Sequence, residues 1–333
     1  MKLPRRKFLH LATGAAALPA VSRFAWAQAY PSRPVRIIAG FPAGGGADIV
    51  ARLIGQWLSE RLGQQFVVEN RPGAGSNIAT EAVVRAPADG YTLLLVHASN
   101  AINTTLYDKL NFNFIRDIAP VAGIMVVPNV MLVHPSVPAK TIPELIAYAN
   151  ANLGKINVAS GSIGGPGHVA AELFKMMTGT DMPLVPYRGG GPALVDLLAG
   201  QVQVGFITAA ASIEYIKTGR LRALAVTTAT RSETLPDIPT MGEFVPGYEA
   251  TSWYGIGVPR NTPAEIVEQL NKEVNAALAD PKMKVRLADL GEALPGSPAD
   301  FAKLIADETE KWGKVIRPLN IKMDRGRSAV DIP

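Results

Sequence analysis

Hydrophobic and polar positions follow two alternating patterns along the chain. Short apolar runs, typical of buried strands, lead through small-residue turns into longer stretches with an apolar residue at every third or fourth position. After Ala47, for example, Val50, Leu53, Ile54 and Trp57 fall on one face of a predicted helix. The runs that predict strands are 35–39, 66–69, 91–96, 130–133, 156–159, 184–187 and 202–206.

The order of these elements predicts an α/β fold with two lobes, each with a central sheet flanked by helices. Strands that alternate with helices build parallel sheets covered on both faces, and the pattern begins again near residue 130. No low-complexity linker separates the two series, so we expect the chain to cross between the lobes on strands, near 121–130 and 224–230. The expected divisions are a leader at 1–27, a first lobe at 28–125 plus 229–333, and a second lobe at 126–228.

The amino terminus has the pattern of an export signal. Arg5 and Arg6 begin a twin-arginine motif, an uncharged run follows over 11–21, and Ala25 and Ala27 give a small-x-small cleavage site. The run is well short of the roughly 20 apolar residues that span a bilayer. We therefore expect cleavage near Ala27 and a periplasmic location, with twin-arginine and general secretory export both open.

Charge and composition exclude several classes of function. The net charge of +5 comes from the five basic residues of the leader, without which 28 basic residues balance 28 acidic ones. A near-neutral mature chain lacks the electrostatic footprint of a nucleic-acid-binding protein. The absence of cysteine excludes disulfides and thiolate chemistry, and no cluster of His, Asp and Glu has metal-ligand spacing.

Five loops of glycine and other small residues follow the predicted strands, at 41–48, 72–77, 161–168, 188–192 and 208–212. In open parallel sheets, ligands bind beyond the carboxyl ends of the strands, where such loops lie. Backbone N–H groups and the positive ends of the following helices can hold an anion there without lysine or arginine. Any one loop alone has an equally good explanation as an ordinary strand-to-helix turn.

The loop sequences resemble those of a known family. The stretches 41–48, 68–75, 101–107, 186–193 and 219–226 are similar, in order, to motifs of the tripartite tricarboxylate transporter substrate-binding proteins, also called Bug-type proteins. The resemblance implies a periplasmic-binding-protein fold of the type II kind and a small carboxylate ligand. It also implies delivery to a membrane permease of the tripartite tricarboxylate type, or in some cases to a sensor. We expect a monomer, no catalytic residue, no cofactor, no metal and no nucleic acid.

Loop position and the resemblance together give the candidate ligand-binding residues. In the first lobe they are Phe41, Pro42, Ala43, Gly44, Gly45, Asp48, Gly75, Ser76, Asn77, His97 and Ser99. In the second lobe they are Ser160, Gly161, Ser162, Gly164, Gly167, His168, Tyr187, Gly189 and Thr208. The family often has an aspartate after the phenylalanine that matches Phe206, whereas this chain has Ile207 and then Thr208. That departure favours an amine-free carboxylate over an amino acid, because a buried ammonium would have no counter-charge.

Two enzyme-like motifs deserve comparison. Gly165, Gly167 and Ala170 match the dinucleotide-binding spacing, but the next predicted strand ends without the acid that holds a ribose. The stretch 160–164 nearly spells the nucleophile elbow of a serine hydrolase, with His97, His134 or His168 as the only possible base of a mature chain. A secreted hydrolase is thus an alternative to a transport receptor or a sensing partner.

Five side chains have two possible roles each. We expect Asp48 to support its own loop, with Arg52 one helical turn away as its partner, because a carboxylate aimed at an anionic ligand would repel it. His97 and His168 suit either ligand contact or local packing, and Tyr187 and Trp253 are either cleft or core aromatics.

Overall fold

The computed structural model describes residues 30–161, 163–187 and 190–319. The predicted leader and the candidate residues Ser162 and Gly189 lie outside these ranges. Nowhere within them is a helix both long and apolar enough to cross a membrane.

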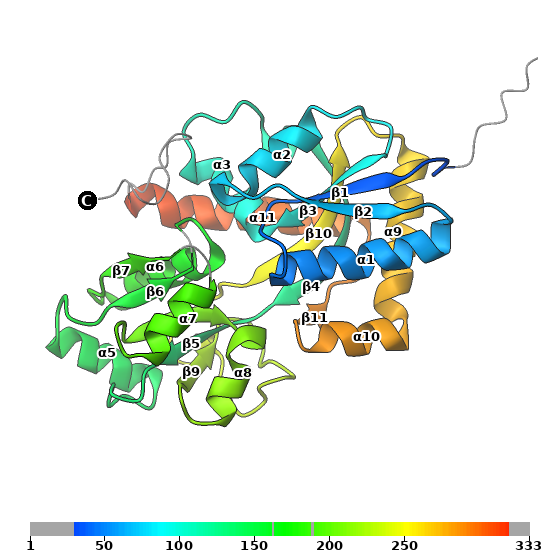
Figure 1. Cartoon of the computed structure of the whole chain (residues 1–333). Helices are drawn as coiled ribbons and strands as arrows, with labels where there is room; N and C mark the ends of the chain where they lie inside the picture. The colour runs from blue at the N-terminus through cyan, green and yellow to red at the C-terminus, as the bar shows by residue number, and fades with distance from the viewer. Residues whose placement is uncertain (1–29, 162, 188–189, 320–333) are drawn as a thin grey trace, which may run out of the picture.

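Two separate sheets form the centres of two lobes, one at the upper right of Figure 1 and one at the lower left. The first sheet has the order β11-β4-β10-β3-β1-β2 and the second has the order β7-β6-β8-β5-β9. The first is built from β1 (Val35–Ala39), β2 (Phe66–Asn70), β3 (Thr92–His97), β4 (Ile118–Val127), β10 (Ser252–Pro259) and β11 (Glu292–Ala293). The second is built from β5 (Asn129–Val133), β6 (Val158–Ser160), β7 (Leu184–Pro186), β8 (Val204–Thr208) and β9 (Arg222–Val226).

Helices cover both sheets, as the strand-helix alternation predicts. In the first lobe they are α1 (Gly46–Leu62), α2 (Asn77–Val84), α3 (Ala98–Leu106), α4 (Phe114–Asp117), α9 (Ala264–Ala279), α10 (Pro281–Ala288) and α11 (Pro298–Leu319). The second lobe has α5 (Ile142–Ala151), α6 (Pro166–Thr178), α7 (Gly190–Leu198) and α8 (Ala209–Lys217). Short 3-10 turns occur at η2 (Ala74–Ser76) and η3 (Met241–Glu243).

The expectation of parallel sheets is wrong for part of each sheet. Strands β1, β2 and β3 pair in parallel, as do β6, β7 and β8, but β10 runs antiparallel to both β3 and β4. Strand β5 likewise runs antiparallel to β8 and β9. The physical reason is that β5 and β10 each begin directly after the chain has crossed from the other sheet, so no covering helix returns them to the parallel direction.

The chain crosses between the sheets twice. It leaves β4 at Val127 and enters β5 at Asn129, and it returns between β9 and β10 through residues 227–251. The two crossings lie side by side, because the backbone N–H of Thr227 donates to the carbonyl of Asn129 at 2.9 Å and the backbone N–H of Asn129 donates to Oγ1 of Thr227 at 3.2 Å. The lobe boundaries at 125/126 and 228/229 stay a prediction.

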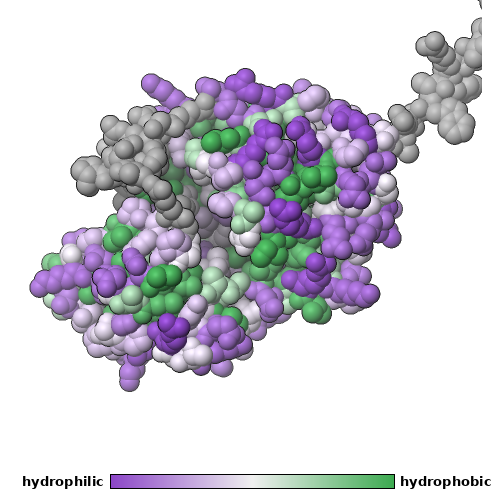
Figure 2. Space-filling model, viewed as in Figure 1, coloured by the Kyte–Doolittle hydropathy of each residue, from purple (hydrophilic) through white to green (hydrophobic). Residues whose placement is uncertain are grey.

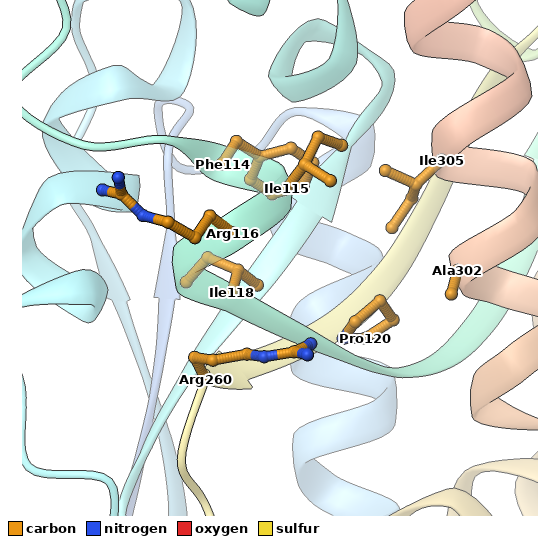
Figure 3. A pocket seen from close by; sticks show the side chains of 8 residues that line it. All are labelled: Phe114, Ile115, Arg116, Ile118, Pro120, Arg260, Ala302 and Ile305. Atoms are coloured by element: carbon orange, nitrogen blue, oxygen red, sulfur yellow. The ribbon is translucent and has the colours of Figure 1, made fainter.

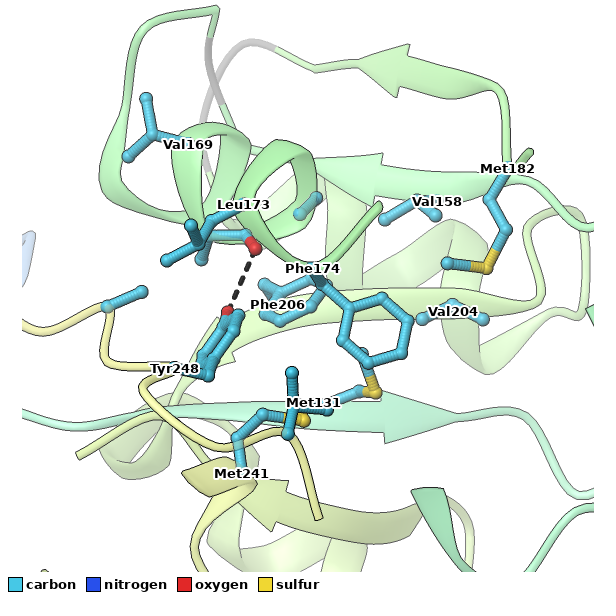
Figure 4. Close-up of a cluster of buried hydrophobic side chains, with 14 of the residues drawn as sticks. Met131, Val158, Val169, Leu173, Phe174, Met182, Val204, Phe206, Met241 and Tyr248 are labelled. Carbon is cyan, nitrogen blue, oxygen red and sulfur yellow. Dashed lines mark hydrogen bonds between the residues drawn. The ribbon is translucent and has the colours of Figure 1, made fainter. Parts of the chain in front are cut away.

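One apolar cluster joins the two lobes. It combines Phe174 and Phe206 of the second lobe and Tyr248 of the return crossing with α3 and with Trp312 of α11. Figure 4 shows part of this cluster, in which the Tyr248 hydroxyl donates to the carbonyl of Ala170 at 2.8 Å. The lobes are therefore packed against one another as well as connected by chain crossings.

Candidate functional site

The first ligand loop, 41–48, is held in shape by Asp48. One oxygen of this buried carboxylate accepts from the backbone N–H of Gly44 at 2.9 Å and from Arg52, and the other accepts from Asn70. Burial opposes ionisation, but the hydrogen bonds from Arg52, Gly44 and Asn70 outweigh it and hold the pKa of Asp48 below its usual range. Asn70 also donates to the carbonyl of Phe41 at 3.0 Å. Asp48 thus supports the loop, and its negative charge is paired with Arg52 and with hydrogen-bond donors of the loop and β2.

The second loop, 72–77, has an unusual backbone. Ala74, Gly75 and Ser76 have φ angles of 47°, 60° and 80°, so two residues other than glycine occupy the left-handed region. Such conformations persist only where the surroundings impose them, and they cluster at functional sites. Asn103 of α3 fixes the loop by donating to the carbonyl of Gly75 at 2.8 Å and to Oδ1 of Asn77 at 3.0 Å.

Three buried polar atoms at the strand ends have no hydrogen-bond partner among the described residues. They are Oγ of Ser76, Nδ2 of Asn77 and Nδ2 of Asn129, and their residues are at most 4% exposed. A fourth such atom, Oε1 of Glu292, lies on the edge strand β11. Leaving one buried donor unpaired costs about 1–3 kcal/mol, so the grouping of such atoms on Ser76 and Asn77 marks a place that suits a polar ligand.

The third loop, 161–168 in the second lobe, meets the first lobe. Gly164 has a φ of +72°, and a Cβ atom there would overlap the side chain of Leu106 and lie 3.9 Å from Oδ1 of Asn103. Asn103 therefore stands between the second loop and the third. The loops of the two lobes face each other at this point. Figure 2 shows a hollow in the molecular surface between the upper and lower lobes.

His168 holds the third loop. The backbone N–H of Gly164 donates to its Nδ1 at 2.7 Å, and its Nε2 lies 4.0 Å from an oxygen of Glu172. Burial lowers the pKa of His168 to about 4, against the opposing effect of Glu172. The imidazole is therefore neutral near pH 7, with Nδ1 as the acceptor, and its role is local.

His97 is a neutral packing residue at the end of β3. The backbone N–H of Ser99 donates to its Nδ1 at 3.0 Å, and its Nε2 lies 3.3 Å from Oγ of Ser252. Its ring packs between Phe41 and Tyr254, with centroids 4.6 and 5.1 Å away, and burial lowers the pKa of His97 to about 3. In both histidines the acceptor nitrogen is taken by a backbone N–H, so neither is placed to act as the base of a hydrolase.

The remaining candidates divide between loop and core. The hydroxyl of Tyr187 donates to Asp196 at 2.8 Å, and Thr208 is the half-buried last residue of β8. Trp253 is fully buried, with its indole N–H 3.4 Å from Glu308, so it is a core aromatic. Ile207 packs in an apolar cluster and offers no charge.

The other predicted residues lie in the turn before α1 and around the end of β6 and the start of α6. The exposed turn before α1 is formed by Pro42, Ala43, Gly44 and Gly45, and Gly45 precedes that helix in extended conformation. Ser160 ends β6 fully buried, followed by the half-buried Gly161, and a Cβ on Gly167 would overlap the carbonyl of Phe206.

Sequence patterns alone do not assign a site role to Asn103, Asn129 or Tyr254. Asn103 lies in the family-like motif at 101–107, and that motif is the sequence feature that could have identified it as a site residue. Nothing local distinguishes Asn129 from an ordinary strand residue.

A separate pocket of about 340 Å³ lies away from all these loops. It is lined by Phe114, Ile115, Arg116, Ile118, Pro120, Arg260, Ala302 and Ile305, and Figure 3 shows the Arg260 side chain extending along one side of it. None of the unpaired buried atoms belongs to this lining, so we place the candidate site at the facing loops.

Comparisons with known proteins agree with the fold and with the loop motifs. The model of the tripartite tricarboxylate transporter family receptor matches residues 50–321. Protein BugT of Bordetella pertussis is 36% identical over 302 residues, covering 89% of this chain and 92% of BugT. A protein of R. palustris solved with adipate has a TM-score of 0.81 at 39% identity, covering 88% of this chain and 99% of that one. MatC of Rhodopseudomonas palustris, solved with bound malate, has a TM-score of 0.77 at 32% identity, with coverage of 86% and 100%.

Proposed function

The chain belongs to the tripartite tricarboxylate transporter family of receptors, which are not enzymes, and we propose that it binds a small carboxylate between its lobes for delivery to a two-component membrane permease. The observation that carries this proposal is the set of unpaired buried polar atoms on the strand-end loops, with Ser76 and Asn77 adjacent in the second loop. These groups suit the oxygen atoms of a carboxylate.

The charge of the site favours an anion. Helices α1, α2 and α6 all begin at the candidate loops, and each helix N-terminus carries about half a positive charge. Arg52 is already paired with Asp48, and both buried histidines are neutral near pH 7. Backbone N–H groups and neutral side chains therefore supply the attraction.

The proposed ligand has no amino group. Ile207 is buried in an apolar cluster and its neighbour Thr208 is uncharged, so neither offers a counter-charge to an ammonium. An unpaired buried ammonium costs several kcal/mol. Two similar proteins were solved with adipate and malate, both amine-free.

Binding is proposed to favour a closed arrangement of the lobes. Each lobe supplies only part of the donors, so a ligand that contacts both binds the closed state better and raises its population. We further propose that the mature protein works in the periplasm after cleavage near Ala27, as the leader pattern predicts.

Calorimetry on the mature protein tests the ligand class. Adipate, malate and the matched pair succinate and aspartate are titrated, and we expect binding of at least one dicarboxylate, with succinate tighter than aspartate. Tighter binding of aspartate would refute the amine-free proposal, and no binding by any of the four would count against a dicarboxylate receptor. Deletion of the permease genes then distinguishes a transport receptor from a sensing partner. Uptake of the ligand should be lost only if the protein delivers it to the permease.

A further inference from the structure

Asn129 lies where the chain enters the second sheet from the first. It is the first residue of β5, directly after the crossing at Pro128, and it is 3% exposed. Its backbone N–H lies 3.2 Å from Oγ1 of Thr227, and its carbonyl accepts from the N–H of Thr227 at 2.9 Å. The main chain of Asn129 is thus tied to the return crossing, while Nδ2 of its side chain has no partner among the described residues.

The register shows which way this side chain lies. Asn129 pairs with Thr208, the last residue of β8, so it stands at the carboxyl end of that strand. By strand alternation it shares a face with Met131, and Thr208 shares that face with Phe206. Met131 and Phe206 both pack in the cluster that includes α6, whereas Val130 and Ile207 pack on the other face. Asn129 therefore lies on the α6 side of the sheet, at the end where the third loop and the α6 N-terminus meet the first lobe.

We propose that Nδ2 of Asn129 donates a hydrogen bond to the bound carboxylate, so that the crossing between the lobes is part of the binding site. This inference rests on the proposed function. Because the main chain of Asn129 is bonded to Thr227, a ligand held at Nδ2 contacts the residue that ties the two crossings together, and its binding is linked to the angle between the lobes. No local sequence feature reveals this role.

Substitution by leucine tests the proposal, because leucine keeps the shape of asparagine and removes its polar atoms. Removing a buried donor that has no partner does not destabilise a protein. We therefore expect Asn129→Leu to have an unchanged or higher Tm without ligand. Its affinity should fall about tenfold or more, as for the loss of a hydrogen bond to a charged group. The probe is the member of a series of malate and the straight-chain dicarboxylates from succinate to sebacate that raises the wild-type Tm most.

Asn275 offers a matched control. Its Nδ2 donates to the carbonyls of Asn271 and Gly296, and its Oδ1 accepts from the N–H of Gly296. We expect Asn275→Leu to lower the Tm and leave the affinity unchanged, the reverse of Asn129→Leu. Unchanged affinity of Asn129→Leu, or a loss of Tm like that of Asn275→Leu, would overturn the inference alone. A wild-type protein whose Tm no dicarboxylate raises would overturn the proposed function and this inference with it.

Discussion

The neutral state of His168 makes a quantitative prediction about acid stability. Burial lowers the pKa of His168 from 6.5 to about 4, so the unfolded chain binds a proton in a range where the folded chain does not. The imidazole's contribution to stability is therefore complete above pH 6.5 and is lost as the pH falls towards 4. At about 1.4 kcal/mol for each pH unit, the loss is about 3 kcal/mol.

Replacement by asparagine isolates this effect. In His168→Asn, the side-chain oxygen can accept from the N–H of Gly164 in place of Nδ1, but nothing titrates at that position. We expect urea unfolding at pH 7 and at pH 4 to show a loss of stability about 3 kcal/mol smaller in the variant than in the wild type. His97 remains in both proteins, so its own acid effect cancels in the difference.

His168→Leu serves as the comparison. It also removes the titration, but it leaves the N–H of Gly164 without an acceptor, which costs about 1–3 kcal/mol at every pH. Identical pH dependence in the wild type and His168→Asn would show that His168 is not held neutral, and the account of the third loop would then be wrong.

Two other predictions concern the loops and the leader. Gly45 has extended backbone and room for a side chain, since a Cβ atom there would lie 3.6 Å from the carbonyl oxygen of Pro42. We therefore expect Gly45→Val to weaken carboxylate binding several-fold in calorimetry with little change in Tm. Gly164→Val should instead lower the Tm, because its side chain would clash with Leu106. Normal binding by Gly45→Val would place the ligand elsewhere. Arg5→Lys with Arg6→Lys should trap precursor in the cytoplasm on fractionation, and undiminished export would refute the twin-arginine route.

Local patterns predict much of the fold, because a strand, a small-residue turn and a helix are each determined over short distances. Helix α1 and its loop follow directly from the apolar spacing after Ala47. No strand is predicted over 252–259, since Gly255 and Gly257 interrupt the apolar run. The structure explains those glycines: side chains at these positions would overlap Phe301 and Val96, which are distant in sequence.

Site residues that belong to the loops can be predicted from the sequence, whereas features that depend on packing between the lobes cannot. The pairing of Asp48 with Arg52 is predictable, because Arg52 lies one helical turn away. The need for glycine at 164 comes from Leu106 in the other lobe, and the unpaired amide of Asn129 is visible only once both crossings are in place. Neither feature leaves a trace in the nearby sequence.

A crystal structure with the tightest-binding dicarboxylate tests the central claim most directly. The account predicts ligand density between the facing loops, with carboxylate oxygens about 3 Å from Nδ2 of Asn77 and Oγ of Ser76. Density in the pocket beside Ile115, Arg260 and Ile305, with none between the loops, would contradict it.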